Sequence, residues 1–173
     1  MPNENLIVTT QIQTLLGSLL AGATGQGLCL LEFDDGGRAD EQLRRLARRL
    51  KCQPQAGTSP FFDALQTQLD EYFAGQRRQF ELPLVLSGTP FQILAWVGLQ
   101  TIPYGQTRSY RAQAEWLGKP AAVRALGKAN ADNPIAILVP CHRLVGSDGN
   151  LTGYGGGLWR KEWLLKLEKE NIQ

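Results

Sequence analysis

A chain of 173 residues is long enough for one sizeable hydrophobic core or for two small ones. Its hydrophobic fraction of 43% and charged fraction of 20% are typical of a globular protein and exclude intrinsic disorder and collagen-like repeats. No apolar run approaches the roughly 20 residues of a membrane span, and no basic segment leads into an apolar stretch at the N-terminus. We therefore expect a cytoplasmic protein that does not act at a membrane.

The formal net charge of +2 is divided unevenly between the two halves of the sequence. Residues 1–86 carry 8 basic and 10 acidic side chains, or −2, whereas residues 87–173 carry 10 basic and 6 acidic ones, or +4. Charge alone favours the explanation that this modest asymmetry is solvated surface charge, although a mild patch for DNA would have the same sign.

The first half predicts a small mixed α/β unit without a chemical signature. Strand-like stretches at 6–10 and 28–33 flank a glycine-rich segment suited to tight turns. Asp40 is expected to cap a helix, 53–58 to form a loop, and Ser59-Pro60 to begin a second helix. Residues 80–86 follow as an extended segment, and Ser87-Gly88 is the natural boundary. We interpret residues 1–86 as a scaffold domain and residues 87–173 as the functional domain.

Helical signals are denser in the second half. Thr89-Pro90 begins a helix that runs to about Gln100, and Ser109 caps another that runs through Leu117. Pro120 is expected at the first position of a third helix over about 121–131. The last two helices, joined by a short turn, match a helix-turn-helix, although a packing-only helical hairpin has the same pattern.

One face of this third helix is small and basic, with no acidic residue. Such a face can approach a DNA groove closely, as minor-groove binders do, and it favours recognition of shape and backbone over a sequence code. Its members, at helical spacing, are Ala121, Arg124, Ala125 and Lys128.

The chemistry is expected at Cys141. The apolar run 135–139 predicts a strand buried on both faces, and it ends in Pro140-Cys141-His142-Arg143. An apolar strand at 144–145 and a hairpin turn at 147–150 follow. A thiol must become a thiolate to attack carbon, and an imidazole or guanidinium nearby favours that form.

Each of these residues can also have a purely structural role. A lone cysteine is more often a buried hydrophobe, and we assign that role to Cys29 and Cys52. Glu168 lies on the inward face of a predicted C-terminal helix, where it can orient His142, although it can equally end a solvated tail.

An odd number of cysteines suits a reducing compartment, and a single histidine makes a four-ligand zinc site hard to build, so we expect no metal.

In the last half of the chain the sequence resembles the O6-alkylguanine-DNA alkyltransferases. The first half is only loosely similar to the family's first domain, a ribonuclease-H-like α/β unit, which implies an α/β fold followed by a mostly helical domain. The motifs that carry the resemblance, in order, are Gly88-Thr89-Pro90-Phe91-Gln92, Ile102-Pro103-Tyr104-Gly105, Ser109-Tyr110, Lys119-Pro120, Val123-Arg124-Ala125, Asn133-Pro134, Pro140-Cys141-His142-Arg143, Gly153-Tyr154, Arg160-Lys161 and Glu168.

The resemblance implies direct-reversal DNA repair, in which an alkyl group moves once and irreversibly from O6 of guanine, or O4 of thymine, to Cys141. It implies that His142 is the base, acting through water, and that Glu168 orients it. Tyr110 is implied as the phenol that helps rotate the nucleotide and protonates the leaving guanine, and Asn133 as a hinge residue.

The family pattern also implies how duplex DNA and the everted base are bound. Arg124 would fill the gap in the base stack within the minor groove, beside the small helix face and Arg143. The pocket would be formed by Leu144, Tyr154, Gly155, Gly156 and Lys161. We expect a monomer without a cofactor. Gly155 and Ala136 depart from residues found in some relatives, which leaves the preference for methyl or bulkier groups open.

Three other functions fit parts of the sequence. A helix-turn-helix transcription factor would not need Cys141 or His142. A non-catalytic alkyltransferase-like binder usually lacks the cysteine. A Cys-His hydrolase would turn over many times, whereas a thioether has no easy hydrolytic exit.

Overall fold

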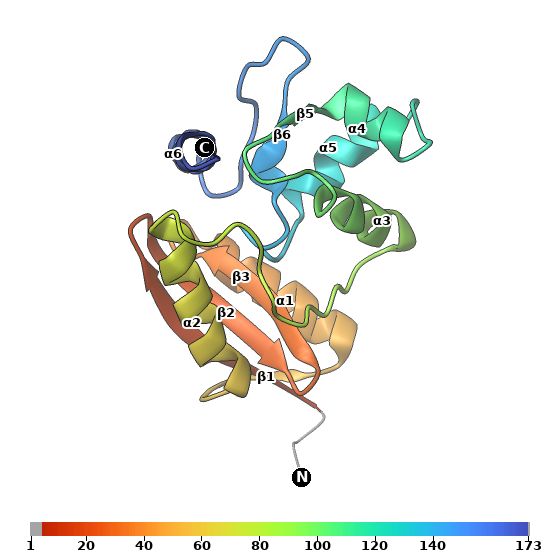
Figure 1. Cartoon of the computed structure of the whole chain (residues 1–173). Helices are drawn as coiled ribbons and strands as arrows, with labels where there is room; N and C mark the ends of the chain where they lie inside the picture. Colours follow the sequence, from red (N-terminus) through yellow and green to blue (C-terminus); the bar gives the residue numbers. More distant parts are fainter. Residues whose placement is uncertain (1–4, 173) are drawn as a thin grey trace. The chain divides into compact units, whose positions relative to one another are not determined.

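A computed structural model describes residues 5–172 of the chain, which forms two compact units, Met1–Ser87 and Gly88–Gln173. None of the helices among these described residues is long and apolar enough to cross a membrane. Unit 1 is an α/β sheet domain and unit 2 is mostly helical (Figure 1), which is the fold class expected from the sequence. The boundary between them falls at Ser87 and Gly88.

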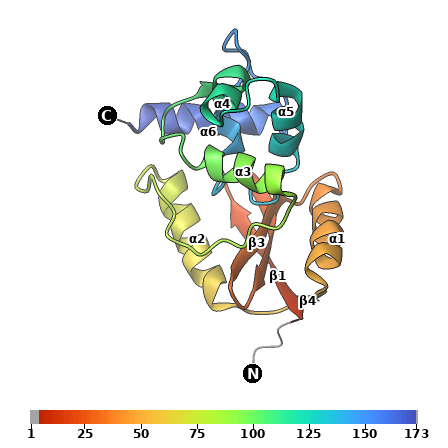
Figure 2. The same cartoon turned by 90° about the vertical axis from the view of Figure 1, so that its right-hand side faces the viewer.

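Unit 1 is a four-stranded sheet with a helix on each face (Figure 2). Strands β1 (Leu6–Thr14), β2 (Gly17–Thr24) and β3 (Gly27–Phe33) are antiparallel, and β4 (Gln53–Ala56) pairs in parallel with β1. Helix α1 (Arg38–Leu50) contacts β3, and α2 (Pro60–Phe73) contacts β1. The apolar stripe of α2 is buried as its spacing predicts: Phe62, Leu65, Leu69 and Phe73.

The sheet corrects three expectations for the first half. The glycine-rich segment has tight turns at 15–16 and 25–26, as expected, but between them it forms strand β2. Gly22 in this strand allows close packing, because a Cβ there would lie 3.1 Å from Ile7 Cγ2 and from Leu30 Cβ. The segment 53–58 contains β4, whose exposed side chains lack any alternation and which is held by backbone pairing to β1. Helix α1 begins after Gly37, at φ 78°, so Asp40 lies in its first turn and does not cap it.

The extended segment before the boundary is tied to the sheet by its backbone. Leu84 forms an isolated parallel bridge with Leu28. The Leu28 amide donates to the Pro83 carbonyl at 2.9 Å, and the Val85 amide donates to the Leu28 carbonyl at 2.7 Å.

Unit 2 contains four α-helices, a short 3₁₀ helix and two very short strands among its described residues. The helices are α3 (Pro90–Leu99), α4 (Tyr110–Trp116), α5 (Val123–Ala131) and α6 (Leu158–Glu170), and the 3₁₀ helix is η1 (Cys141–Arg143). Strands β5 (Arg108–Ser109) and β6 (Leu144–Val145) pair in parallel.

Two helix starts in unit 2 agree with the sequence and one does not. Thr89 forms a capping box with Gln92, and Ser109 accepts a hydrogen bond from the Ala112 amide. Helix α5 instead begins at Val123 with Ala122 as its N-cap, so Pro120 lies in the preceding turn. The Ala122 amide donates to the Lys119 carbonyl at 2.9 Å, which closes that turn before the helix starts.

The apolar run 135–139 is a buried turn, which corrects the predicted strand. The Val139 amide donates to the Ile135 carbonyl at 3.1 Å, and Ile137 takes a positive φ of 71° that an extended strand excludes. Every residue of the run is buried. Its apolar composition therefore reflects burial, which a strand and a compact turn share. The turn at 147–150 likewise leads into no returning strand.

Candidate active site

Cys141 begins η1 directly after the buried turn. Its amide donates to the Val139 carbonyl at 2.8 Å, and its side chain is only 6% exposed. Cys141 lies between a compact turn and a 3₁₀ helix. Backbone hydrogen bonds on both sides therefore hold the residue in place, as they would at the end of the strand that the sequence predicted.

Asn133 braces this turn from within. Its Nδ2 donates to the Val139 carbonyl at 2.9 Å and to the Ile135 carbonyl at 3.3 Å, while its Oδ1 accepts from the Ile135 amide at 3.0 Å. The side chain is 2% exposed, so these bonds replace water that the turn cannot reach.

A buried polar cluster lies next to the thiol. His142 Nε2 lies 2.6 Å from Glu168 Oε2, and both side chains are almost fully buried. Arg143 Nε donates to the other Glu168 oxygen at 2.7 Å, and its Nη1 donates to the Ile102 carbonyl at 2.7 Å. The side chain of Glu168 thus reaches from α6 to two neighbouring residues of η1.

Burial and pairing set the protonation of this cluster. Burial lowers the pKa of His142 below its usual 6.5, although Glu168 acts in the opposite direction. Burial would raise the pKa of Glu168, but the contacts with His142 and Arg143 outweigh it and lower that pKa to about 2. The directions of these two shifts favour an ionised Glu168 beside a neutral imidazole.

The neutral imidazole has one ring nitrogen left to accept a proton. Its Nε2 faces a carboxylate, which only accepts, so Nε2 carries the hydrogen. Nδ1 is then a lone pair, and it has no hydrogen-bond partner within residues 5–172. Nδ1 is therefore the ring nitrogen that is able to accept a proton.

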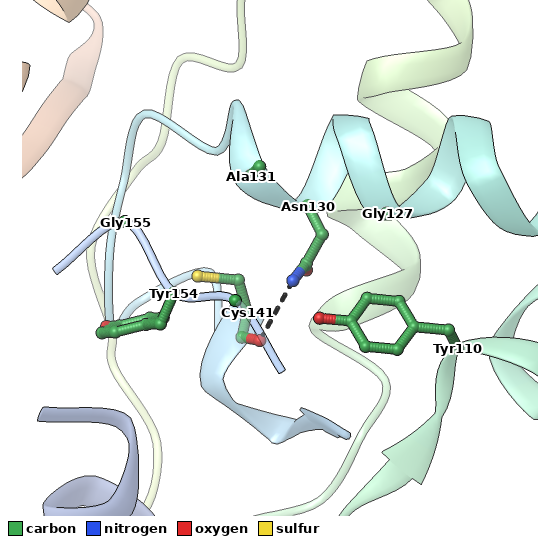
Figure 3. A pocket seen from close by; sticks show the side chains of 8 residues that line it. Tyr110, Gly127, Asn130, Ala131, Cys141, Tyr154 and Gly155 are labelled. Atoms are coloured by element: carbon green, nitrogen blue, oxygen red, sulfur yellow. Dashed lines mark hydrogen bonds between the residues drawn. The ribbon is translucent and has the colours of Figure 1, made fainter. Parts of the chain in front are cut away.

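Cys141 lines a pocket of about 200 Å³ in unit 2 (Figure 3). The walls come from α4, α5, η1 and the loop before α6. Tyr110 directs its hydroxyl toward Asn130 and Cys141, and Tyr154 lies on the other side of the thiol. The lining residues are Tyr110, Gly127, Asn130, Ala131, Cys141, Gly153, Tyr154 and Gly155.

Lys161 holds the loop that closes this pocket. Its side chain is fully buried, and Nζ donates to the Thr152 carbonyl at 2.9 Å and to the Gly153 carbonyl at 3.2 Å. Burial lowers its pKa from 10.5 to about 8. The Tyr110 hydroxyl donates to the same Thr152 carbonyl at 3.3 Å, and burial raises the pKa of that phenol.

The basic face of α5 is solvent-exposed, as its spacing predicts. Arg124, Ala125 and Lys128 are exposed on the helix, and Ala121 is exposed in the turn that precedes it, because α5 starts only at Val123. The helix residues Leu126, Ala129 and Asn130 are buried against the rest of the unit. The helix therefore turns its two cations outward and its only buried amide toward the pocket.

Several predicted site residues lie elsewhere than expected. Arg143 is buried in its pair with Glu168, which corrects its expected contact with DNA. Leu144 is buried in β6, Gly156 accepts a bond from Arg160, and Lys161 supports the loop from behind, so the pocket lining includes none of the three.

Part of the pocket wall consists of residues outside the predicted site. Asn130, Gly127, Ala131 and Gly153 line the pocket without having been predicted to do so. A polar amide on the otherwise apolar side of α5 was the available signal for Asn130, because a buried polar group normally has a partner there.

The other two cysteines lie in unit 1, away from this cluster. Cys29 is fully buried, and burial raises its pKa to about 12. Cys52 is 8% exposed and donates its S–H to the Leu50 carbonyl at 3.4 Å. No group of three or more metal-binding side chains gathers anywhere in residues 5–172.

Comparisons with known protein families cover both units. Residues 7–86 match the ribonuclease-like domain of 6-O-methylguanine DNA methyltransferase, and residues 90–170 match its DNA-binding domain. A Methanosarcina barkeri protein named methylated-DNA–protein-cysteine methyltransferase is 43% identical over 94% of this chain and 97% of its own length. A Mycobacterium leprae protein of the same name is 58% identical over 61% of this chain and 64% of its own length.

Solved structures show the same similarity. The crystal structure of Mycobacterium tuberculosis O6-methylguanine methyltransferase is 41% identical, with a TM-score of 0.82 over 96% of this chain and 95% of that one. The structure of Mycobacterium tuberculosis OGT in complex with DNA is 42% identical, with a TM-score of 0.79 over 96% and 94%. Both units match domains of one family, and the 43% identity to the Methanosarcina barkeri protein extends over nearly the full length of both chains. This chain therefore belongs to the family of methylated-DNA–protein-cysteine methyltransferases.

Proposed function

We propose that this chain repairs alkylated DNA by transferring the alkyl group from O6 of guanine to Sγ of Cys141. The observation that carries the proposal is the placement of Cys141 in a pocket wall, directly before a histidine that a buried carboxylate orients. Family membership supports the same chemistry, since the relatives are named for alkyl transfer from DNA to a protein cysteine.

The His142–Glu168 pair activates the thiol. A neutral imidazole with its hydrogen on Nε2 presents Nδ1 as the base. A water molecule between Cys141 and Nδ1 carries the thiol proton to the ring, and the Glu168 carboxylate stabilises the imidazolium that results. Glu168 is ionised beforehand, because its pKa of about 2 lies far below neutral pH.

The thiolate then displaces the guanine oxygen from the alkyl carbon. The C–O bond breaks as the S–C bond forms, and its electron pair stays with the purine. Tyr110 donates its proton to a purine ring nitrogen, and its raised pKa keeps the phenol protonated until then. Backbone amides of the loop at Gly153, Tyr154 and Gly155 bind the guanine oxygen as its charge develops.

The product explains why each molecule acts once. A thioether, unlike a thioester, offers water no easy leaving group, so Cys141 stays alkylated. O4 of thymine carries the same kind of alkyl–oxygen bond next to a ring nitrogen, and we include it as a second substrate.

Duplex DNA binds the exposed face of α5 through its minor groove. Ala125 on this face and Ala121 in the turn before it let the helix approach closely. Arg124 and Lys128 supply positive charge. Because the reacting carbon lies within the duplex, the base is everted into the pocket, and Arg124 fills the space that it leaves. We propose that one cytoplasmic copy of the chain does this without a partner subunit.

The test is incubation with methylated duplex DNA, followed by mass spectrometry of the digested protein. We expect one added methylene on the peptide that contains Cys141, once per molecule, and none in a Cys141→Ser variant. Methylation at Cys29 or Cys52 instead, or no methylation, contradicts the proposal. Repeated turnover would indicate a hydrolase, and an intact reporter response in a Cys141→Ala variant would indicate a helix-turn-helix transcription factor.

A further inference from the structure

The amide of Asn130 lies between the two groups that the proposed reaction uses. Asn130 is 6% exposed on α5, and its Nδ2 donates to the carbonyl of Cys141 at 3.3 Å. In Figure 3 the Tyr110 hydroxyl points toward this amide, whose nitrogen is directed at the Cys141 carbonyl. Cys141, Asn130 and Tyr110 thus form one continuous side of the pocket.

The orientation of this amide follows from its partner. A backbone carbonyl only accepts hydrogen bonds, so the group that faces Cys141 O is the NH₂ and not the oxygen. One hydrogen of Nδ2 is used in that bond. The second hydrogen of a planar amide lies in the same plane and is free to approach another acceptor in the wall.

Packing alone does not account for an asparagine at this position. Its Oδ1 is buried and has no hydrogen-bond partner in the described part of the chain. An unsatisfied buried acceptor costs free energy that an apolar side chain of the same shape would not. The amide is therefore held here at a cost to stability, as functional groups often are.

We propose that Asn130 is a positioning residue that acts through Tyr110. Its second Nδ2 hydrogen binds the phenolic oxygen, aims the hydroxyl hydrogen at the everted purine, and stabilises the phenolate that remains when that proton has left. The inference rests on the proposed function, since it assigns Asn130 a part in the same transfer.

The proton balance of the reaction gives this contact its role. The thiol proton goes to His142 and the phenol proton goes to the purine, so an imidazolium and a phenolate remain when the S–C bond has formed. Solvent then returns a proton to Tyr110 from His142. The phenolate forms in a half-buried pocket beside sulfur. The Lys161 Nζ lies 5.8 Å from the Tyr110 ring centroid and adds positive charge, and the Asn130 amide is the group placed to donate a hydrogen bond.

The electrostatics of Tyr110 agree with this geometry. Burial raises the pKa of the phenol most, and the nearby Cys141 raises it further, whereas the side chain of Asn130 lowers it. The Thr152 carbonyl that accepts from the hydroxyl at 3.3 Å lies on the loop. An everted purine replaces that acceptor, while the Asn130 donor stays in place on its helix.

The experiment compares two reactions of the same thiol in the full-length protein. One is single-turnover methyl transfer from O6-methylguanine in duplex DNA, where the leaving group needs a proton. The other is alkylation of Cys141 by iodoacetamide, where iodide leaves without one. Both rates are measured for the unsubstituted protein, Asn130→Leu, Tyr110→Phe and the double variant, with Asn130→Ala as a second substitution that adds no bulk.

We expect Asn130→Leu and Asn130→Ala to slow methyl transfer about 10-fold, the effect of one lost hydrogen bond, and to leave iodoacetamide alkylation within about twofold. In the Tyr110→Phe background the further loss is within about twofold, because the contact no longer exists. Equal losses in both reactions, full additivity in the double variant, or no loss overturns the inference. Absence of methyl transfer in the unsubstituted protein would instead contradict the proposed function.

Discussion

Glu168 is the residue on which the proposed active site depends most. It is 1% exposed and accepts from both His142 and Arg143, so three ionisable groups share one buried space. The paired charges roughly offset the cost of their own burial, but removing one partner leaves the others uncompensated.

We expect Glu168→Gln to destabilise the protein by about 3 kcal/mol, because the buried Arg143 loses its counter-charge. Urea unfolding at pH 7 measures the change. Glu170→Gln, an exposed carboxylate on the same helix, is the matched control and should change stability by less than about 0.5 kcal/mol. Similar values for the two variants would mean that the buried ion pair adds nothing to stability.

Two residues of this cluster make stability depend on pH in the same direction. The folded pKa of His142 lies below 6.5, so the unfolded chain binds a proton that the folded chain does not, and stability falls as pH drops below about 6.5. The pKa of Glu168 is lowered from 4.5 to about 2, so its contribution is present above 4.5 and is lost as pH falls toward 2.

We therefore expect the free energy of unfolding to decrease between pH 7 and pH 5 through His142, and to decrease further below pH 4.5 through Glu168. Urea titrations at pH 7, 5.5 and 4 measure this, and His142→Gln should remove the loss between pH 7 and 5. A protein that gains stability on acidification over that interval would show that His142 is charged in the folded state.

At this scale the sequence was most informative where motif and chemistry coincide. His142 and Glu168 are in contact, as the family pattern implied, although Glu168 follows His142 by 26 residues and Arg143 by 25 in the sequence. The contact of Arg143 with DNA was expected from the family pattern, whereas its pair with Glu168 depends on the fold, which brings α6 to η1.

At the scale of elements, the buried turn 135–139 decides where the thiol lies. Its carbonyls are held by the Asn133 side chain and its residues are buried, so water cannot replace those bonds. Substitution of Asn133 leaves backbone groups unsatisfied in the interior.

We expect Asn133→Leu to cost about 2–4 kcal/mol, because two or more buried backbone groups lose their partner, and to slow methyl transfer as the turn before Cys141 loosens. Urea unfolding and single-turnover transfer are the two measurements. Asn150→Leu, at an exposed position, serves as the control. An Asn133→Leu protein with ordinary stability would mean that the backbone bonds of the turn suffice.

Helices with a capping residue or a periodic apolar face could be predicted from the sequence, whereas strands that depend on pairing with a neighbouring strand could not. Thr89, Ser59 and Ser109 cap helices where expected, since capping is a local interaction. Strand β4 is held by its neighbour β1 and carries no pattern of its own. The run 135–139 shows that apolar composition predicts burial but not backbone conformation.

Helix α5 supports a separate prediction about DNA. We expect Arg124→Ala to slow methyl transfer from duplex DNA much more than from free O6-methylguanine, because only the duplex has a gap to fill. Rates on both substrates are compared with those of Lys166→Ala, an exposed cation on α6. Equal losses on the duplex and the free base would contradict a role in the base stack.

The molecule as a whole distributes three thiols over two units, and their surroundings predict very different reactivity. Cys29 and Cys52 are core residues of unit 1, whereas Cys141 lines a pocket of unit 2. With a pKa of about 12, Cys29 is a thiolate in only about one molecule in ten thousand at pH 8. A fold that buries two thiols and exposes one to a pocket thereby directs alkylation to a single site.

We expect iodoacetamide to modify Cys141 first in the native protein at pH 8, and Cys29 only when urea unfolds unit 1. Peptide mass spectrometry over time measures both rates. Protein that has already reacted with methylated DNA should take no label at Cys141, in proportion to the methyl groups transferred, because the thioether has consumed the only reactive thiolate. Labelling of Cys29 in the native chain at the rate of Cys141 would show that burial does not protect it, and methylated protein that still labels at Cys141 would place the methyl group elsewhere.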